Sequence, residues 1–150
     1  MGEAGPDGFY IRKHFSLVII NSTKRVERQR FTAAHELTHH LFDHQSAVDR
    51  DIFGTRNVPE RRANAFAAFF LLPRAGVRRW LLRGGWKDDG PLALDAASIV
   101  HLAHRFGLSY EATPYQLGDL GGLHTRDLKS LKAVPPERMA RRLGYDLEAA

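Results

Sequence analysis

Four of the chain's eight histidines lie in one short stretch, AAHELTHHLFDH, which runs from Ala33 to His44. The stretch contains no glycine or proline and continues a segment with a helical pattern. On a helix, His35 and His39 share one face one turn apart, so their ring nitrogens can converge on a single metal ion. Glu36 is turned aside by one position and would lie beside that ion, near a water molecule. This HExxH spacing is typical of a zinc site with a glutamate as general base.

A catalytic zinc needs a third protein ligand and one open position, and the sequence offers Glu60. Glu60 follows His39 after twenty intervening residues, which is enough for a loop and a turn back, and it begins a second predicted helix. Asn64 lies one turn further on the same face, where it can hydrogen-bond a ligand imidazole and fix its tautomer. An acidic residue in a first helical turn also favours the helix dipole, which would explain Glu60 taken alone. Because Glu60 comes together with HExxH, we favour its interpretation as a ligand to one catalytic zinc ion.

The remaining histidines give weaker signals. His40 and His44 are also four residues apart, but they point about 140° away from His35, and we expect them to be solvated. His101 and His104 lie in a later predicted helix, where a surface or hydrogen-bonded histidine is the simpler interpretation. An oxyanion in such a site could be stabilised by one of four residues, and the sequence does not distinguish among them. They are Tyr115, His101, His104 and His124.

Composition limits the class of protein. The chain has 150 residues, of which 43% are hydrophobic and 26% charged, and this favours one folded domain over residues 1–150. It has no cysteine, so a zinc ion must be held by histidine and carboxylate ligands.

The charge balance and the apolar runs bear on partners and location. The longest apolar run, Ala65 to Leu72, is too short to cross a bilayer, and the first residues lack the layout of a signal peptide. We therefore expect a cytoplasmic protein with no membrane partner. The 22 basic and 17 acidic residues give a net charge of +5, which favours a solvated basic surface over direct binding of nucleic acid.

The elements that must position the site begin with a β-hairpin. Aromatic and β-branched residues fill Phe9–Arg12 and Phe15–Ile20, around a short polar break. Asn21, Ser22 and Thr23 can then cap a helix that runs from Lys24 to about His44. We expect a loop from Gln45 to Val58.

A second helix is predicted from Pro59 to Leu72, where Pro73 stops it. A third is predicted over Ala75–Leu82, with Gly84 and Gly85 at its end. The predicted apolar face of the second helix consists of Ala63, Phe66, Ala67, Phe70 and Leu71.

The rest of the chain is predicted to be helical. Asp95 is a candidate N-cap of a helix that ends at Gly107, and Thr113 and Pro114 favour the start of another. Two further short helices are predicted over 126–132 and 136–143. The fold class is therefore α+β and mainly α, with a hairpin followed by five or six helices.

The two blocks RFTAAHELTHHLF and ERRANAFAAFFLLP resemble the ImmA/IrrE family of bacterial metallopeptidases, within the thermolysin-like gluzincins. The resemblance implies a zincin-like catalytic core over about 9–83 and a helical tail over about 91–150. It also implies that His35, His39 and Glu60 bind zinc and that Glu36 is the catalytic base. The chain departs from the family's usual pattern at Thr38, Leu108 and Gln116.

The leading hypothesis is a zinc-dependent endopeptidase in which Glu36 takes a proton from water and returns it to the leaving amine. The resemblance implies that the substrate is a helix-turn-helix repressor, with a role in transcription regulation and stress response. An extended substrate is expected to add along the Phe15–Ile20 strand.

Two other functions stay open from sequence. One is a non-catalytic module that sequesters a repressor or nucleic acid, with a zinc site that is structural or vestigial, and the other is a zinc hydrolase that acts on non-peptide amides. The helix pair over 95–118 is a weak helix-turn-helix candidate for the first, because Pro114 interrupts its second helix. A basic patch also favours the first, and it consists of Lys24, Arg25, Arg28 and Arg30.

Overall fold

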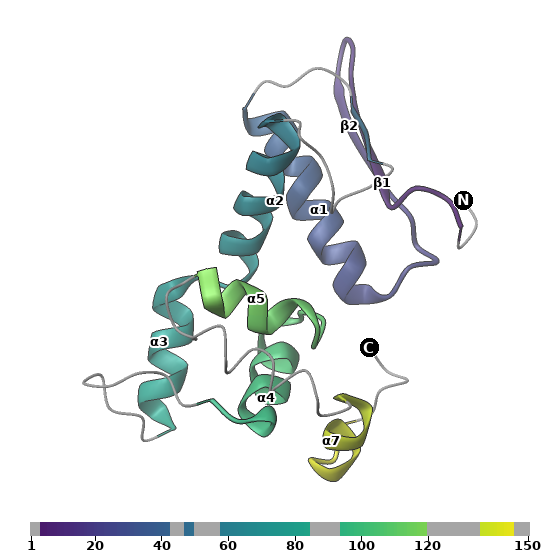
Figure 1. Cartoon of the computed structure of the whole chain (residues 1–150). Coiled ribbons are helices and arrows are strands. Elements are labelled where there is room, and N and C mark those ends of the chain that lie inside the picture. The colour runs from purple at the N-terminus through teal and green to yellow at the C-terminus, as the bar shows by residue number, and fades with distance from the viewer. Residues whose placement is uncertain (1–3, 43–46, 50–57, 85–93, 120–135, 146–150) are drawn as a thin grey trace. The chain divides into compact units, whose positions relative to one another are not determined.

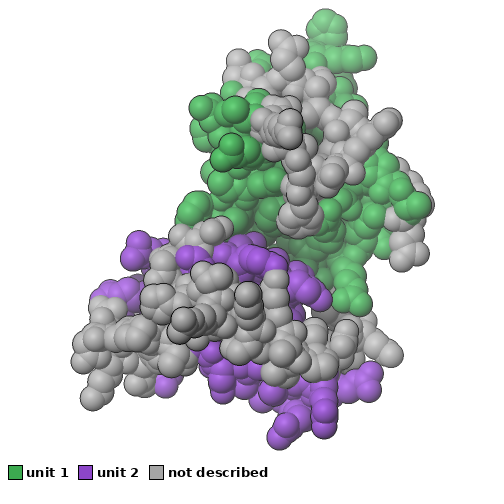
Figure 2. All heavy atoms as spheres, in the orientation of Figure 1, with its two compact units in different colours: residues 1–71 green, residues 72–150 purple. Residues whose placement is uncertain are grey.

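Residues 4–42, 47–49, 58–84, 94–119 and 136–145 are described in the computed structural model of the chain (Figure 1). Contacts within the chain divide it into two compact units, residues 1–71 and residues 72–150, which Figure 2 colours separately. The single domain predicted over 1–150, with a core over 9–83 and a tail over 91–150, stays a prediction.

The first unit begins with the predicted hairpin. Strands β1 (Gly8–Arg12) and β2 (Ser16–Ile20) pair antiparallel, with Tyr10 opposite Val18. A third strand, β3 (Ala47–Asp49), pairs antiparallel with the other edge of β1, so that the sheet order is β2-β1-β3. The prediction of an unbroken loop after the first helix is wrong at these residues, because a three-residue strand is too short to show a pattern of alternation.

Helix α1 (Val26–Leu41) packs against both hairpin strands and against the second helix. Its N-cap is Arg25, whose side chain makes no capping hydrogen bond, so the predicted cap at residues 21–23 is wrong. Asn21 instead forms a turn before the helix, where its Oδ1 accepts hydrogen bonds from the amide (3.1 Å) and hydroxyl (2.8 Å) of Thr23. An asparagine that bonds the chain two residues on favours such a turn over a cap.

Helix α2 (Val58–Leu71) begins and ends within one residue of its predicted bounds. Ala63 and Ala67 are fully buried, and their small side chains let α2 approach α1 closely. Phe70, predicted on the apolar face, is 58% exposed. It lies beyond the two buried alanines, and its ring stacks on that of Phe66 with centroids 5.5 Å apart.

In the second unit, helix α3 (Arg74–Arg83) follows Pro73 and ends at Gly84. Helix α4 (Ala96–Phe106) confirms both predicted ends. The Asp95 carboxylate accepts a hydrogen bond from the amide of Ser98 at 2.8 Å, and Gly107 adopts a left-handed φ of 63°.

Helix α5 (Ala112–Asp119) begins earlier than predicted. The Ser109 hydroxyl accepts a hydrogen bond from the amide of Ala112, and the Thr113 hydroxyl donates to the Ser109 carbonyl, so Thr113 is inside the helix and does not cap it. Helix α7 (Pro136–Arg142) is followed by Gly144, whose φ is 77°. Both α5 and α7 pack on α4, and the helix predicted over 126–132 lies outside the described residues.

The described elements are mostly helices, with one small antiparallel sheet near the N-terminus, which confirms the α+β class. Across the described ranges, no helix combines the length and the apolar character that a membrane span requires.

Candidate metal centre

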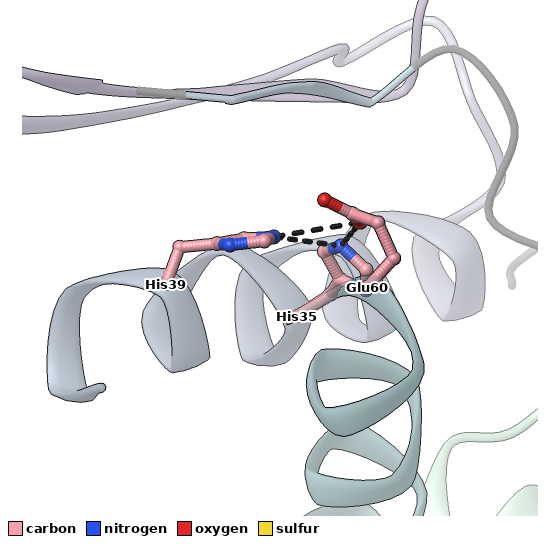
Figure 3. A group of neighbouring side chains, drawn as sticks. All are labelled: His35, His39 and Glu60. Atoms are coloured by element: carbon pink, nitrogen blue, oxygen red, sulfur yellow. Dashed lines mark hydrogen bonds and ion pairs between the residues drawn. The ribbon is translucent and has the colours of Figure 1, made fainter. Parts of the chain in front are cut away.

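Two neighbouring helices of the first unit bring His35, His39 and Glu60 together. The histidines come from the buried face of α1, where their side chains are 0% and 1% exposed, and Glu60 comes from the first turn of α2. Figure 3 shows the two imidazole rings rising from one helix and the carboxylate reaching toward them from the other. The i, i+4 spacing of the histidines produces this convergence, because it places both rings on the side of α1 that faces α2.

The separations between the three donor atoms fit a tetrahedral cation. His35 Nε2 lies 3.0 Å from Glu60 Oε2 and 3.1 Å from His39 Nε2, and His39 Nε2 lies 3.6 Å from Glu60 Oε2. Zinc bonds of about 2.0–2.1 Å at tetrahedral angles put neighbouring ligand atoms about 3.3–3.4 Å apart. One ion placed among these atoms would therefore reach all three with small adjustments.

Asn64 decides which nitrogen of His35 offers a lone pair. Its Oδ1 lies 2.9 Å from His35 Nδ1, so Nδ1–H donates this hydrogen bond. The lone pair of His35 is then on Nε2, which faces the Glu60 carboxylate. A neutral His35 with its hydrogen on Nδ1 can offer the Nε2 lone pair to a metal ion at the point where the three side chains converge.

Glu36 lies next to His35 on α1 and is fully buried. Its Oε1 is close to Gly8 on β1, since an ideal Cβ built on that glycine would be 3.3 Å from it. The carboxylate is therefore held between α1 and the first strand. The role of Glu36 as a general base beside a metal ion stays a prediction.

The buried side of α1 is unusually polar. Burying polar groups is unfavourable unless they are satisfied by partners, so such a cluster is typical of a functional site. The buried residues of this helix are Thr32, Ala34, His35, Glu36, Thr38 and His39.

Sequence reasoning missed three side chains beside the centre. Tyr10 is fully buried on β1, and its ring lies 6.2 Å from that of His39 at an interplanar angle of 17°. The Tyr10 hydroxyl lies 3.3 Å from Ser16 Oγ, and His40 Nδ1 lies 3.2 Å from the same oxygen. The His40 side chain is exposed, as expected from the sequence, but it also contacts the Ser16 hydroxyl. The alternation along β1 could have indicated that Tyr10 faces α1.

The four candidates for stabilising an oxyanion lie in the second unit or outside the described residues. His101 hydrogen-bonds the Tyr145 hydroxyl, and the His104 ring packs on the same tyrosine. Tyr115 is exposed on α5, and His124 lies outside the described residues. A role for any of them stays a prediction.

The basic patch predicted on the first helix is partly neutralised. Asp7 accepts a hydrogen bond of 2.6 Å from the Arg28 guanidinium and lies 3.6 Å from Lys24 Nζ. Two of the four basic residues are thus paired with a carboxylate, which weakens their case as a nucleic-acid surface.

A hairpin, an HExxH helix and a second helix with a glutamate in its first turn are the arrangement of a metallopeptidase of the HExxH type. Residues 1–117 match the Peptidase_M78 family, described as the IrrE N-terminal-like domain, and the chain belongs to this family. The resemblance noted in the sequence is thereby confirmed.

One curated relative is the radiation response metalloprotease IrrE of Deinococcus deserti. The two sequences are 34% identical over 119 residues, which cover 75% of this chain and 39% of the relative. The chain therefore spans about two fifths of the length of that protein. No solved structure matches the chain significantly.

Proposed function

We propose that the chain is a zinc-dependent endopeptidase that hydrolyses a peptide bond in a protein substrate. The observation that carries the proposal is the convergence of His35 Nε2, His39 Nε2 and Glu60 Oε2 within 3.0–3.6 Å of one another. Membership of a peptidase family and the metalloprotease relative support it independently.

Each residue of the centre has a distinct role in this proposal. His35, His39 and Glu60 hold the zinc ion, and Asn64 keeps the His35 lone pair on Nε2. When bound, zinc supplies the Lewis acidity that makes water nucleophilic near neutral pH and polarises the scissile carbonyl. The Glu36 carboxylate takes a proton from the attacking water and delivers it to the nitrogen of the leaving amine.

The substrate is proposed to bind as an extended strand along β2. This strand lies at one edge of the sheet, and its Leu17 and Val18 side chains are exposed. A peptide that pairs with such an edge gains main-chain hydrogen bonds regardless of its sequence, so neighbouring pockets must provide the specificity.

The natural substrate is proposed to be a DNA-binding repressor of the helix-turn-helix class, cleaved in the cytoplasm during a stress response. The support is the ImmA/IrrE resemblance and the radiation-response name of the relative, which describes that protein. Cleavage of such a repressor would turn on the genes that it silences.

The test is turnover of a repressor by the zinc-loaded protein. Helix-turn-helix regulators encoded beside its gene are incubated with about one fiftieth of their molar amount of protein, and fragments are identified by mass. Glu36→Gln should retain zinc and lower the cleavage rate by about 10²–10⁴-fold, because it removes the general base but no ligand. Undiminished proteolysis by Glu36→Gln would disprove the assignment.

Glu60→Ala separates metal binding from proton transfer. Loss of a hydrogen-bonding partner of a ligand typically weakens metal binding by about 10–100-fold, so loss of the ligand itself should exceed about 100-fold. Competition with a chromophoric chelator measures the affinity. If the repressor is bound one to one and stays intact under all conditions, the sequestering module predicted as the alternative is the correct function.

A further inference from the structure

The hairpin packs an aromatic ring against one of the proposed ligands. Tyr10 lies in the middle of β1, and its ring faces that of His39 nearly in parallel, with centroids 6.2 Å apart. This separation falls within the range of offset-stacked aromatic pairs. Tyr10 is also fully buried, so its ring cannot leave this position without opening the core of the unit.

The Tyr10 hydroxyl belongs to a small polar network at the end of the same ring. It lies 3.3 Å from Ser16 Oγ and 3.5 Å from His40 Nδ1, and these two atoms are 3.2 Å apart. A consistent arrangement has Tyr10 donating to Ser16 Oγ and Ser16 donating to His40 Nδ1. The network therefore joins β1, β2 and α1 at a single point.

Each of the two proposed imidazole ligands has a neighbouring side chain in contact with its ring. The ring of His35 is fixed by the hydrogen bond between its Nδ1 and Asn64. The ring of His39 is packed by Tyr10, whose hydroxyl is held by residues of the adjacent strand and of the same helix.

We propose that Tyr10 is a positioning residue for His39, and that Ser16 and His40 fix Tyr10 in this role. The inference rests on the proposed metal site. It assigns to the hairpin the task of holding one ligand ring at the angle that directs Nε2 toward Glu60. A change in the hairpin would then change metal binding without altering any ligand.

The experiment compares Tyr10→Leu with Tyr10→Phe in the full chain. Tyr10→Leu removes the aromatic ring, whereas Tyr10→Phe keeps the ring and loses the hydroxyl. Zinc affinity is measured by chelator competition, and Co²⁺ is added as a probe because its visible absorption bands respond to ligand geometry. Ile99→Ala, at a buried position of α4 in the second unit, is the control for a core substitution elsewhere in the chain.

We expect Tyr10→Leu to weaken zinc binding by about 10–100-fold and to shift the Co²⁺ bands, as for other groups that orient a ligand. Tyr10→Phe should keep the wild-type bands and lose about threefold in affinity, as expected for one hydrogen bond. Ile99→Ala should bind zinc as the wild type does. Wild-type affinity and bands in Tyr10→Leu would overturn the inference.

A second variant covers the case in which Tyr10→Leu does not fold. Ser16 and His40 are both exposed, so Ser16→Ala combined with His40→Ala should leave the fold intact. This variant leaves the Tyr10 hydroxyl without these two contacts, so, as for Tyr10→Phe, we expect wild-type Co²⁺ bands and an affinity loss of about threefold. Unchanged affinity would overturn the inference. Failure of the wild type itself to bind either metal would instead disprove the proposed function.

Discussion

At the scale of single residues, Gly8 makes room for the proposed base. An ideal Cβ at this position would lie 2.4 Å from Thr32 Cγ2 and 2.9 Å from the carbonyl oxygen of Ile19. It would also lie 3.3 Å from Glu36 Oε1. A side chain on Gly8 would therefore push β1 away from α1 at the point where Glu36 is held.

We predict that Gly8→Ala lowers the free energy of unfolding by about 1–3 kcal/mol, as overpacking of a core does, and lowers the cleavage rate. Zinc affinity should change less than the rate, because no ligand is displaced. Urea denaturation, chelator competition and the repressor assay measure the three quantities. Thr32→Ser removes the clashing methyl group and should restore part of the stability in the double variant. Wild-type stability and rate in Gly8→Ala would contradict this account.

The proposed ligands could be predicted from sequence, whereas the contact between the Tyr10 and His39 rings could not. Helix geometry alone places residues four apart on one face, and this is enough to bring His35 and His39 together and to set Asn64 one turn after Glu60. The contact between Tyr10 and His40 joins residues 30 positions apart. It depends on how the hairpin packs on α1, and no local pattern encodes that packing.

At the scale of elements, the segment before β1 anchors the start of α1. Asp7 binds Arg28 and Lys24, and its backbone carbonyl accepts a hydrogen bond from the amide of Asn21. Burial alone would raise the pKa of Asp7, but the hydrogen bond and charge of Arg28, with a smaller effect of Lys24, outweigh it and lower the pKa below 3.8. The ion pair therefore stabilises the folded state at neutral pH.

We predict that Asp7→Asn lowers the free energy of unfolding by about 1 kcal/mol at pH 7, a modest value because the pair is partly exposed. A lowered pKa contributes stability above the unfolded value, about 3.9, and this contribution is lost as the pH falls through the folded value. The difference between variant and wild type should thus shrink from pH 7 to pH 3 in urea denaturation of the metal-free protein. Glu111→Gln, an exposed substitution in the second unit, is the control and should show no such trend. A difference that is constant with pH would show that the charge of Asp7 is not responsible.

Helix ends could be predicted from sequence where a residue next to the end can cap the helix by itself. Asp95 and Gly107 cap α4 as expected, because a carboxylate before a helix and a glycine after it satisfy groups that are close in sequence. The prediction failed before α1, where Asn21 bonds Thr23 instead of the helix. It also failed at β3, since three residues form a strand only because the edge of β1 is there to pair with them.

At the scale of the whole molecule, the three proposed ligands all belong to the first unit, residues 1–71. A ligand that binds only the folded state stabilises the part of the protein whose unfolding destroys its site. Zinc binding should therefore stabilise the first unit more than the second.

We predict that zinc at about 100 times its dissociation constant slows hydrogen exchange in α1 and α2. The free energy of opening obtained from the exchange rates should rise there by up to about 2.7 kcal/mol, with little change in α4. Exchange followed by mass spectrometry with and without zinc measures this. Glu60→Ala is the control and should show no gain in protection. An equal gain in α4 would contradict the prediction, because it would mean that both units unfold together.

The separation of His39 and Glu60 along the chain has a consequence for how fast the protein is degraded in a cell. A zinc ion shared by these residues would cross-link the backbone and close a loop with twenty intervening residues. A covalent link around a loop of this size restricts the unfolded chain by about 3 kcal/mol, and a metal clip acts in the same direction. Molecules that lack the ion would open more often and be degraded sooner by cellular proteases. The amount of this protein would then follow the supply of zinc even when its synthesis is constant.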